Sequence, residues 1–288
     1  MKKIFKFLSL VITTILLTGC IDIDKDSMEN INIYTSVYPI EYVTNALYGT
    51  HSNILSIYPS DVNPYTYKLT NKQINNYSKG NLVIYNGLEK EKDYVVKMLN
   101  KNKRLKIIDA TAKIEYTNSM DEVWINPSNM ITIAQNTRNG LKEYINSDII
   151  KSEIDDNYNK LKLELSTIDA NLKETVANAK DNNIIIADDD LSILSKYGIN
   201  ITSIDEDTMS DKSLADAKAL LNNKTVSYIF VKKGYKETDT MKSLKETYKA
   251  EYLEIDTLNN LALDDKNNNK DYITIMGENI DKLKEELY

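Results

Sequence analysis

The chain has 288 residues, of which 42% are hydrophobic and 27% are charged, a composition typical of a globular protein. Its 36 basic and 43 acidic side chains give a formal net charge of -7, so it lacks the basic excess that binding to nucleic-acid phosphates requires. The chain has one cysteine, which excludes an internal disulfide and a thiol-rich metal centre.

The N-terminus has the pattern of a signal peptide, over residues 1–19. Lysines at the start precede an apolar run, residues 7–17, that is too short to cross a bilayer as a resident helix. The run leads into the sequence LTGC, in which a small residue precedes Cys20 as in a lipobox. We therefore expect cleavage before Cys20 and lipidation of that cysteine. Residues 20–30 are polar and acidic, and we expect them to form a spacer.

Short β-branched runs alternate with longer mixed stretches over residues 31–150, a pattern that predicts βα units and a parallel sheet. The expected strands are 31–36, 54–58, 82–85 and 105–108. Turn residues follow closely after the first three. Because parallel sheets bind ligands beyond the carboxyl ends of their strands, we expect a binding site among these turns.

Residues 152–179 contain no Gly or Pro and place apolar side chains at helical spacing, which predicts one long amphipathic helix. The second half repeats the first, with strands expected at 184–187, 199–204, 228–231 and 252–255 and helices at 213–221 and 240–248. The predicted fold is therefore α/β, with two lobes that each contain a parallel four-stranded sheet flanked by helices. The lobes are 31–150 and 181–288, and the connector helix is 151–180.

Six segments stand out along the chain: YTSVYP at 34–39, NPYTYK at 63–68, LVIYNGLE at 82–89, VWINP at 123–127, SKYG at 195–198 and YIFV at 228–231. Together they resemble a known family, the zinc/manganese-type metal-binding lipoproteins that serve ABC importers and include proteins described as adhesins. Their order and spacing cover nearly all of the mature chain. The resemblance implies two α/β lobes joined by a long helix, with a cation held between them.

The family takes its metal ligands, histidines and carboxylates, from four loops, two in each lobe. The family's histidine ligands are missing here, since the one histidine, His51, falls outside these loops. The resemblance places Tyr65 and Glu122 at the first two positions and Asp256 at the fourth. The third falls on Ala187, directly before the run Asp188–Asp190. The expected metal ligands are Tyr65, Glu122, Asp188 and Asp256, and which of the three consecutive aspartates faces the cleft stays open.

This ligand set contains only oxygen, which favours manganese or iron as the cargo over zinc. Tyr65 would bind as a phenolate only to a strongly polarising cation such as ferric iron, and would otherwise donate a hydrogen bond. Each residue also has a simpler interpretation. Glu122 fits a surface acid, Tyr65 is one of 20 tyrosines, and an aspartate after a strand is a common helix N-cap.

The sequence thus predicts an exported solute-binding protein, anchored by lipid at the outer face of the cell membrane, that delivers a metal cation to an ABC permease and its ATPase as a monomer. It shows no nucleophile elbow and no phosphate-binding glycine loop, so we do not expect an enzyme. One alternative is a binding protein for a small organic ligand held between aromatic side chains. The other is a surface adhesion or interaction lipoprotein with a degenerate metal site.

Overall fold

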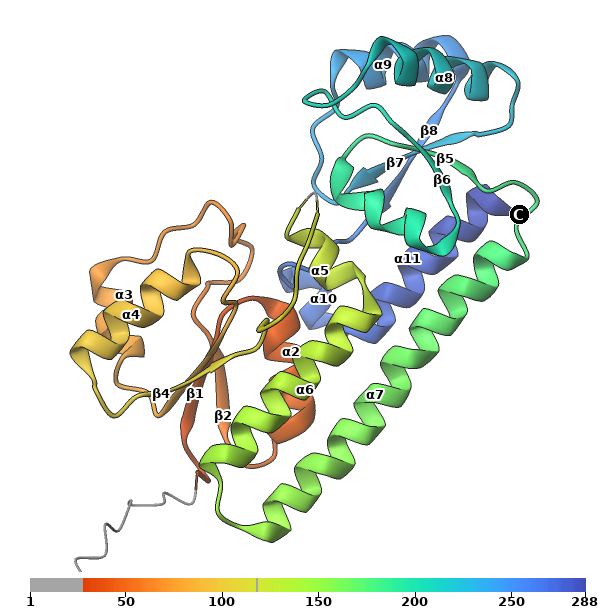
Figure 1. The fold of residues 1–288 in the computed structure, drawn as a ribbon. Coiled ribbons are helices and arrows are strands. Elements are labelled where there is room, and N and C mark those ends of the chain that lie inside the picture. The colour runs from red at the N-terminus through yellow and green to blue at the C-terminus, as the bar shows by residue number, and fades with distance from the viewer. Residues whose placement is uncertain (1–27, 118) are drawn as a thin grey trace, which may run out of the picture.

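The computed structural model describes residues 28–117 and 119–288 (Figure 1). The predicted signal peptide, Cys20 and most of the predicted spacer lie outside the described residues. Within the described ranges, no helix has both the length and the apolar character needed to cross a membrane.

The first lobe is a parallel sheet with helices on both faces (Figure 1). Its strands are β1 (Asn32–Thr35), β2 (Asn53–Ser56), β3 (Leu82–Tyr85) and β4 (Lys106–Asp109), in the order β2-β1-β3-β4. Its helices are α2 (Tyr38–Tyr48), α3 (Asn71–Tyr77), α4 (Glu91–Lys101), α5 (Asp121–Ile125) and α6 (Pro127–Tyr144). All four side chains of β3 are buried, because this inner strand is covered on both faces.

The second lobe repeats this strand order. Its strands are β5 (Asn183–Ile186), β6 (Asn200–Ser203), β7 (Tyr228–Lys232) and β8 (Glu251–Ile255), all parallel, in the order β6-β5-β7-β8. Its helices are the 3-10 helix η1 (Asp189–Tyr197), α8 (Asp211–Asn222), α9 (Asp239–Tyr248), α10 (Leu263–Asn267) and α11 (Tyr272–Leu287). The predicted α/β fold with two parallel four-stranded sheets is therefore confirmed.

One long helix, α7 (Asp148–Ala177), runs past both lobes and packs against α2, α6 and α11 (Figure 1). Its buried side chains include Ile154, Leu161, Leu165 and Leu172, the stripe expected from the sequence. The helix begins three residues before the predicted start at 151, because the Ser147 side chain caps it by accepting from Ile150 N, and it ends three residues before the predicted end at 180. The helix ties the two lobes to one continuous apolar core.

The eight predicted strands are present, with ends that differ from the expected ones by no more than two residues. The strands could be predicted this closely because runs of Ile and Val bounded by turn residues are typical of parallel sheets, whose strands are buried on both faces. The carboxyl ends of the strands in the two lobes lie on either side of the junction between the lobes, and the candidate site is found there.

Candidate functional site

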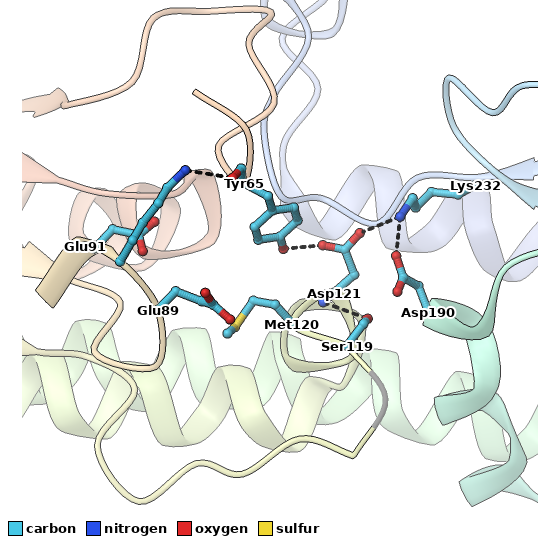
Figure 2. Close-up of a pocket in the computed structure, with 9 residues that line it drawn as sticks. Tyr65, Glu89, Glu91, Ser119, Met120, Asp121, Asp190 and Lys232 are labelled. Atoms are coloured by element: carbon cyan, nitrogen blue, oxygen red, sulfur yellow. Dashed lines mark hydrogen bonds and ion pairs between the residues drawn. The ribbon is translucent and has the colours of Figure 1, made fainter. Parts of the chain in front are cut away.

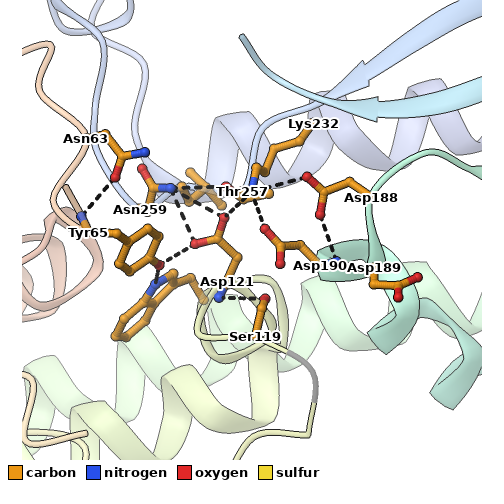
Figure 3. A network of polar contacts seen from close by, with 12 residues as sticks. Asn63, Tyr65, Ser119, Asp121, Asp188, Asp189, Asp190, Lys232, Thr257 and Asn259 are labelled. Atoms are coloured by element: carbon orange, nitrogen blue, oxygen red, sulfur yellow. Dashed lines mark hydrogen bonds and ion pairs between the residues drawn. The ribbon is translucent and has the colours of Figure 1, made fainter. Parts of the chain in front are cut away.

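The loops that follow the strands of both lobes bring a polar cluster together between the lobes (Figure 3). Its members are Tyr65 after β2, Asp121 at the start of α5, Asp188 and Asp190 after β5, Lys232 at the end of β7, and Asn259 after β8. We call these six residues the cleft cluster. It lies where parallel sheets place binding sites, beyond the carboxyl ends of the strands.

Lys232 is the centre of the cleft cluster (Figure 3). Its Nζ lies 3.3 Å from Asp188 Oδ2 and 3.6 Å from Asp121 Oδ2, and it donates a hydrogen bond to Asp190. Asp121 belongs to the first lobe and the two other aspartates to the second. One ammonium group therefore lies among three carboxylates and links the lobes.

Asp121 is the most deeply placed acid of the cluster, with only 1% of its surface exposed. Its carboxylate accepts hydrogen bonds from Tyr65 Oη and from Asn259 Nδ2, the latter at 3.3 Å. The Tyr65 hydroxyl in turn accepts from Trp124 Nε1 at 3.0 Å. Trp124 is fully buried beneath the cleft, as a packing residue that also orients Tyr65.

The charges of the cluster follow from burial and from the neighbouring groups. Burial raises the pKa of Asp121 and of Asp188 above the usual range for aspartate. Burial, the largest single influence, acts in the same direction on Asp190, but its hydrogen bonds with Lys232 and Ser119 and the positive charge of Lys232 together outweigh it and lower the pKa. Burial lowers the pKa of Lys232, yet the surrounding carboxylates raise it above its ordinary value, so the lysine is an ammonium cation.

Tyr65 is a neutral phenol in this arrangement. Burial and the Asp121 carboxylate hold the pKa of its hydroxyl far above the ordinary value for tyrosine. The hydroxyl therefore donates to Asp121, which is the role expected in the absence of a strongly polarising cation.

The four predicted ligands fall into separate networks. Tyr65 and Asp188 belong to the cleft cluster. Glu122 is 5% exposed, and its Oε2 accepts from Thr117 N at 2.9 Å. Asp256 pairs instead with Lys233, Oδ2 to Nζ, at 2.8 Å. Over residues 28–117 and 119–288, no three side chains of the His, Cys, Asp or Glu type are grouped so that they could hold a metal ion. The four-residue ligand set therefore stays a prediction.

The consecutive aspartates divide their roles. Asp188 is the N-cap of η1, since its side chain accepts from Asp190 N at 2.9 Å, so one of the three is a cap, as expected. Asp189 accepts hydrogen bonds from Ser203 Oγ and Thr208 Oγ1, both at 2.6 Å, and so belongs to a hydrogen-bond network within the second lobe. Asp188 and Asp190 therefore are the members of the run that reach the cleft cluster.

The sequence did not single out Asp121, Lys232 and Asn259 as site residues, and it left Asp190 as one of three consecutive aspartates that could face the cleft. Asp121 is adjacent to Glu122, and the start of a five-residue helix gives no signal for which of the two faces the cleft. Lys232 directly follows a buried strand segment, and this position at the carboxyl end of a parallel strand is the one signal that could have singled it out.

Two cavities adjoin the cluster, and Lys232 lines both. The smaller, about 260 Å³, is lined by Tyr65, Glu91, Asp121 and Asp190 among others (Figure 2). Glu91 is 1% exposed, and its Oε1 accepts from Tyr58 Oη at 2.8 Å while Oε2 has no hydrogen-bond partner. The larger cavity, about 530 Å³, is lined by polar residues of both lobes, including Asp61, Asn63 and Asp256.

Two α/β lobes joined by a long helix, with charged side chains meeting between them, define a two-lobed binding protein. The family model described as "ZnuA: Zinc-uptake complex component A periplasmic" matches residues 33–286. The chain therefore belongs to the ZnuA family, the metal-binding solute-binding proteins of ABC importers. Members of this family are extracytoplasmic binding proteins, not enzymes, and work with a permease and an ATPase. Among curated proteins, no match to this chain is found.

Solved structures similar to this chain have the same fold. The metal-dependent lipoprotein YcdH from Bacillus subtilis is 21% identical with a TM-score of 0.75, over 90% of this chain and 99% of that one. The Zn(II)-bound ZnuA-like domain of Streptococcus pneumoniae AdcA is 19% identical with a TM-score of 0.72, over 90% and 99%. A manganese-bound variant of a periplasmic metal binding protein from Candidatus Liberibacter asiaticus is 15% identical with a TM-score of 0.71, over 90% and 100%.

Proposed function

We propose that the protein is the lipid-anchored solute-binding component of an ABC importer and that its cargo is manganese or iron rather than zinc. The observation that carries the proposal is the convergence of Asp121, Asp188 and Asp190 from two lobes on one positive charge. As arranged around the ammonium, these carboxylates are not one of the groupings that could hold a metal ion in the described residues, so metal binding requires them to move closer together. A cleft that surrounds a cation with carboxylates stabilises positive charge through oxygen atoms alone. Oxygen donors suit harder cations, whereas zinc prefers nitrogen and sulfur.

The single histidine of the chain supports the choice of metal. His51 lies before β2, at the amino end of that strand, and its Nε2 is 2.7 Å from Glu153 Oε2 of α7. It therefore serves the packing of the connector helix and supplies no imidazole to the cleft. The similar structures bind zinc, manganese or cadmium, so the fold by itself does not select the metal.

Among the predicted ligands, Asp188 has the strongest support because its carboxylate already contacts a cation. Glu122 and Asp256 would have to leave Thr117 and Lys233 to join it. Cys20, preceded by the lipobox, would hold the mature chain at the outer face of the membrane. Anchoring raises the effective concentration of the binding protein at its permease.

The test is equilibrium dialysis of the purified mature chain against Mn²⁺, Fe²⁺ or Zn²⁺, followed by elemental analysis. We expect manganese or iron to bind at one ion per chain and zinc to remain below stoichiometric occupancy. An Asp188→Asn variant should lose most of the bound metal. Asp216→Asn, which removes an exposed carboxylate that pairs with Lys212 on α8, is the control and should bind as wild type does. Stoichiometric zinc in preference to manganese would contradict the proposal.

One observation favours a small organic ligand as a second candidate. Glu91, one of the residues that line the 260 Å³ cavity beside the cleft cluster, has a buried Oε2 without a hydrogen-bond partner among the described residues. A buried carboxylate oxygen without a partner is costly, and an amine or hydroxyl donor from a ligand would satisfy it. Ethanolamine and putrescine are suitable probes in thermal unfolding. This candidate predicts stabilisation that Glu91→Gln weakens, and it fails if neither amine raises the unfolding temperature of the wild type.

A further inference from the structure

We propose that Lys232 is a resident cation that occupies the cargo position in the cleft and competes with the metal. The inference rests on the proposed function, because it assigns to one residue the control of metal affinity at the same site. Lys232 would then set how tightly the protein holds its cargo.

The Lys232 ammonium lies between carboxylates of the two lobes. It contacts Asp121 of the first lobe, and Asp188 and Asp190 of the second. A metal ion that bridged the lobes through these oxygens would need the space that Nζ now fills. Metal and ammonium therefore cannot both bind the three carboxylates.

The positive charge of Lys232 partly neutralises the carboxylates around it. Three carboxylates and one ammonium leave the cluster with formal charge 1 − 3 = −2, and without the ammonium the charge would be −3. Carboxylates that already pair with an ammonium attract a second cation less strongly, and two cations a few ångströms apart repel each other at low dielectric. Metal binding therefore requires Lys232 to leave the cluster.

The Lys232 side chain adjoins a cavity into which it could rotate. This side chain forms part of the wall between the two cavities and is 31% exposed. The larger cavity, about 530 Å³, is also lined by the polar side chains of Asp61 and Asn63. Rotation of the four-carbon stem of Lys232 into this cavity would free the three carboxylates without movement of either lobe's sheet.

The neighbouring Lys233 does not share this position. Successive side chains of a strand point to opposite sides, and Lys233 follows the last residue of β7. Its Nζ lies 2.8 Å from Asp256 Oδ2 and 2.6 Å from Asp265 Oδ2, outside the cleft cluster. The competing cation is therefore specifically Lys232.

The experiment is calorimetric titration of MnCl₂ into the mature chain and its Lys232→Met variant. Methionine keeps the length of the stem and removes the charge, so we expect Mn²⁺ to bind at least tenfold more tightly to this variant. Lys232→Arg retains the charge and should bind as the wild type does. Lys245→Met is a matched control, since it removes one positive charge from the exposed face of α9, where Lys245 faces Glu237 at 3.8 Å.

The outcomes separate this inference from the proposed function. Binding by the wild type with no gain in Lys232→Met overturns the inference and leaves the metal cargo standing. Binding by Lys232→Met alone supports the inference and overturns the metal cargo for the wild type. Absence of binding in both overturns both. Circular dichroism confirms that the variants fold, and Lys232→Gln, for which the same gain is expected, replaces Lys232→Met if that variant does not.

Discussion

The hydroxyl of Tyr65 forms hydrogen bonds with two buried side chains, Asp121 and Trp124, and its removal should lower the free energy of unfolding. In Tyr65→Phe, Asp121 loses the hydrogen bond from Tyr65, worth about 1.5–3 kcal/mol for a bond to a charged acceptor. Trp124, which is fully buried, loses the acceptor of its Nε1–H, at a cost of about 1–3 kcal/mol. The two losses together span about 2.5–6 kcal/mol, and since Asn259 still donates to Asp121 we expect a net loss in the lower part of that span, about 3 kcal/mol.

Chemical denaturation followed by tryptophan fluorescence measures this loss directly, because Trp124 is the only tryptophan of the chain. In thermal unfolding the loss corresponds to about 6–12 °C for a chain of this size. Tyr67→Phe is the matched control from the same loop. It removes only a hydroxyl that accepts from Gln73 Nε2 at 2.9 Å and should cost about 1 kcal/mol or less. A Tyr65→Phe variant within about 0.5 kcal/mol of wild type would refute the described network.

Two further predictions concern the scaffold. Gly140 of α6 faces β4, and an added Cβ would lie 2.6 Å from Ile108 Cγ1, so Gly140→Ala should destabilise the protein by about 1–2 kcal/mol despite the better helix propensity of alanine. Gly277→Ala, with no atom within 4 Å of the added Cβ, should stabilise it by up to about 1 kcal/mol. Equal effects of the two substitutions in urea denaturation would refute the packing argument. Burial raises the pKa of Glu286 to about 7, so the folded state binds the extra proton and the stability from this group is lost as pH rises from about 4.5 to 7. Glu286→Gln should therefore lose less stability than wild type between pH 5 and pH 8, and parallel pH profiles would contradict this.

The sequence was sufficient for the fold because the relevant signals are local. The run LVIY at β3 is buried over its full length, and such runs bounded by turns predict inner strands of parallel sheets. The long helix α7 was predicted from the absence of Gly and Pro and from its apolar spacing. Its ends were displaced by three residues each, because a single Ser147 cap shifts a helix start without altering the apolar pattern and the last predicted residues lie beyond the helix end at Ala177.

The site was less predictable because it depends on contacts between distant segments. Lys232 and Asp121 are 111 positions apart, and no local pattern indicates that an ammonium and a carboxylate will meet between two lobes. Tyr65 and Asp188 were placed by the resemblance of their loops to a known family, and both reach the cleft cluster. The choice between Asp121 and Glu122 required the orientation of α5, which follows from its packing on the second lobe.

The central claim, that the space between the lobes is a cation site held by Lys232 in the absence of cargo, is tested most directly by anomalous diffraction from crystals of the mature chain grown with Mn²⁺. The claim predicts one manganese peak within coordination distance of Asp188, with the Lys232 side chain turned away from the carboxylates. A crystal grown at saturating Mn²⁺ that shows no anomalous manganese peak between the lobes, with Lys232 still bound to Asp190, would contradict the claim.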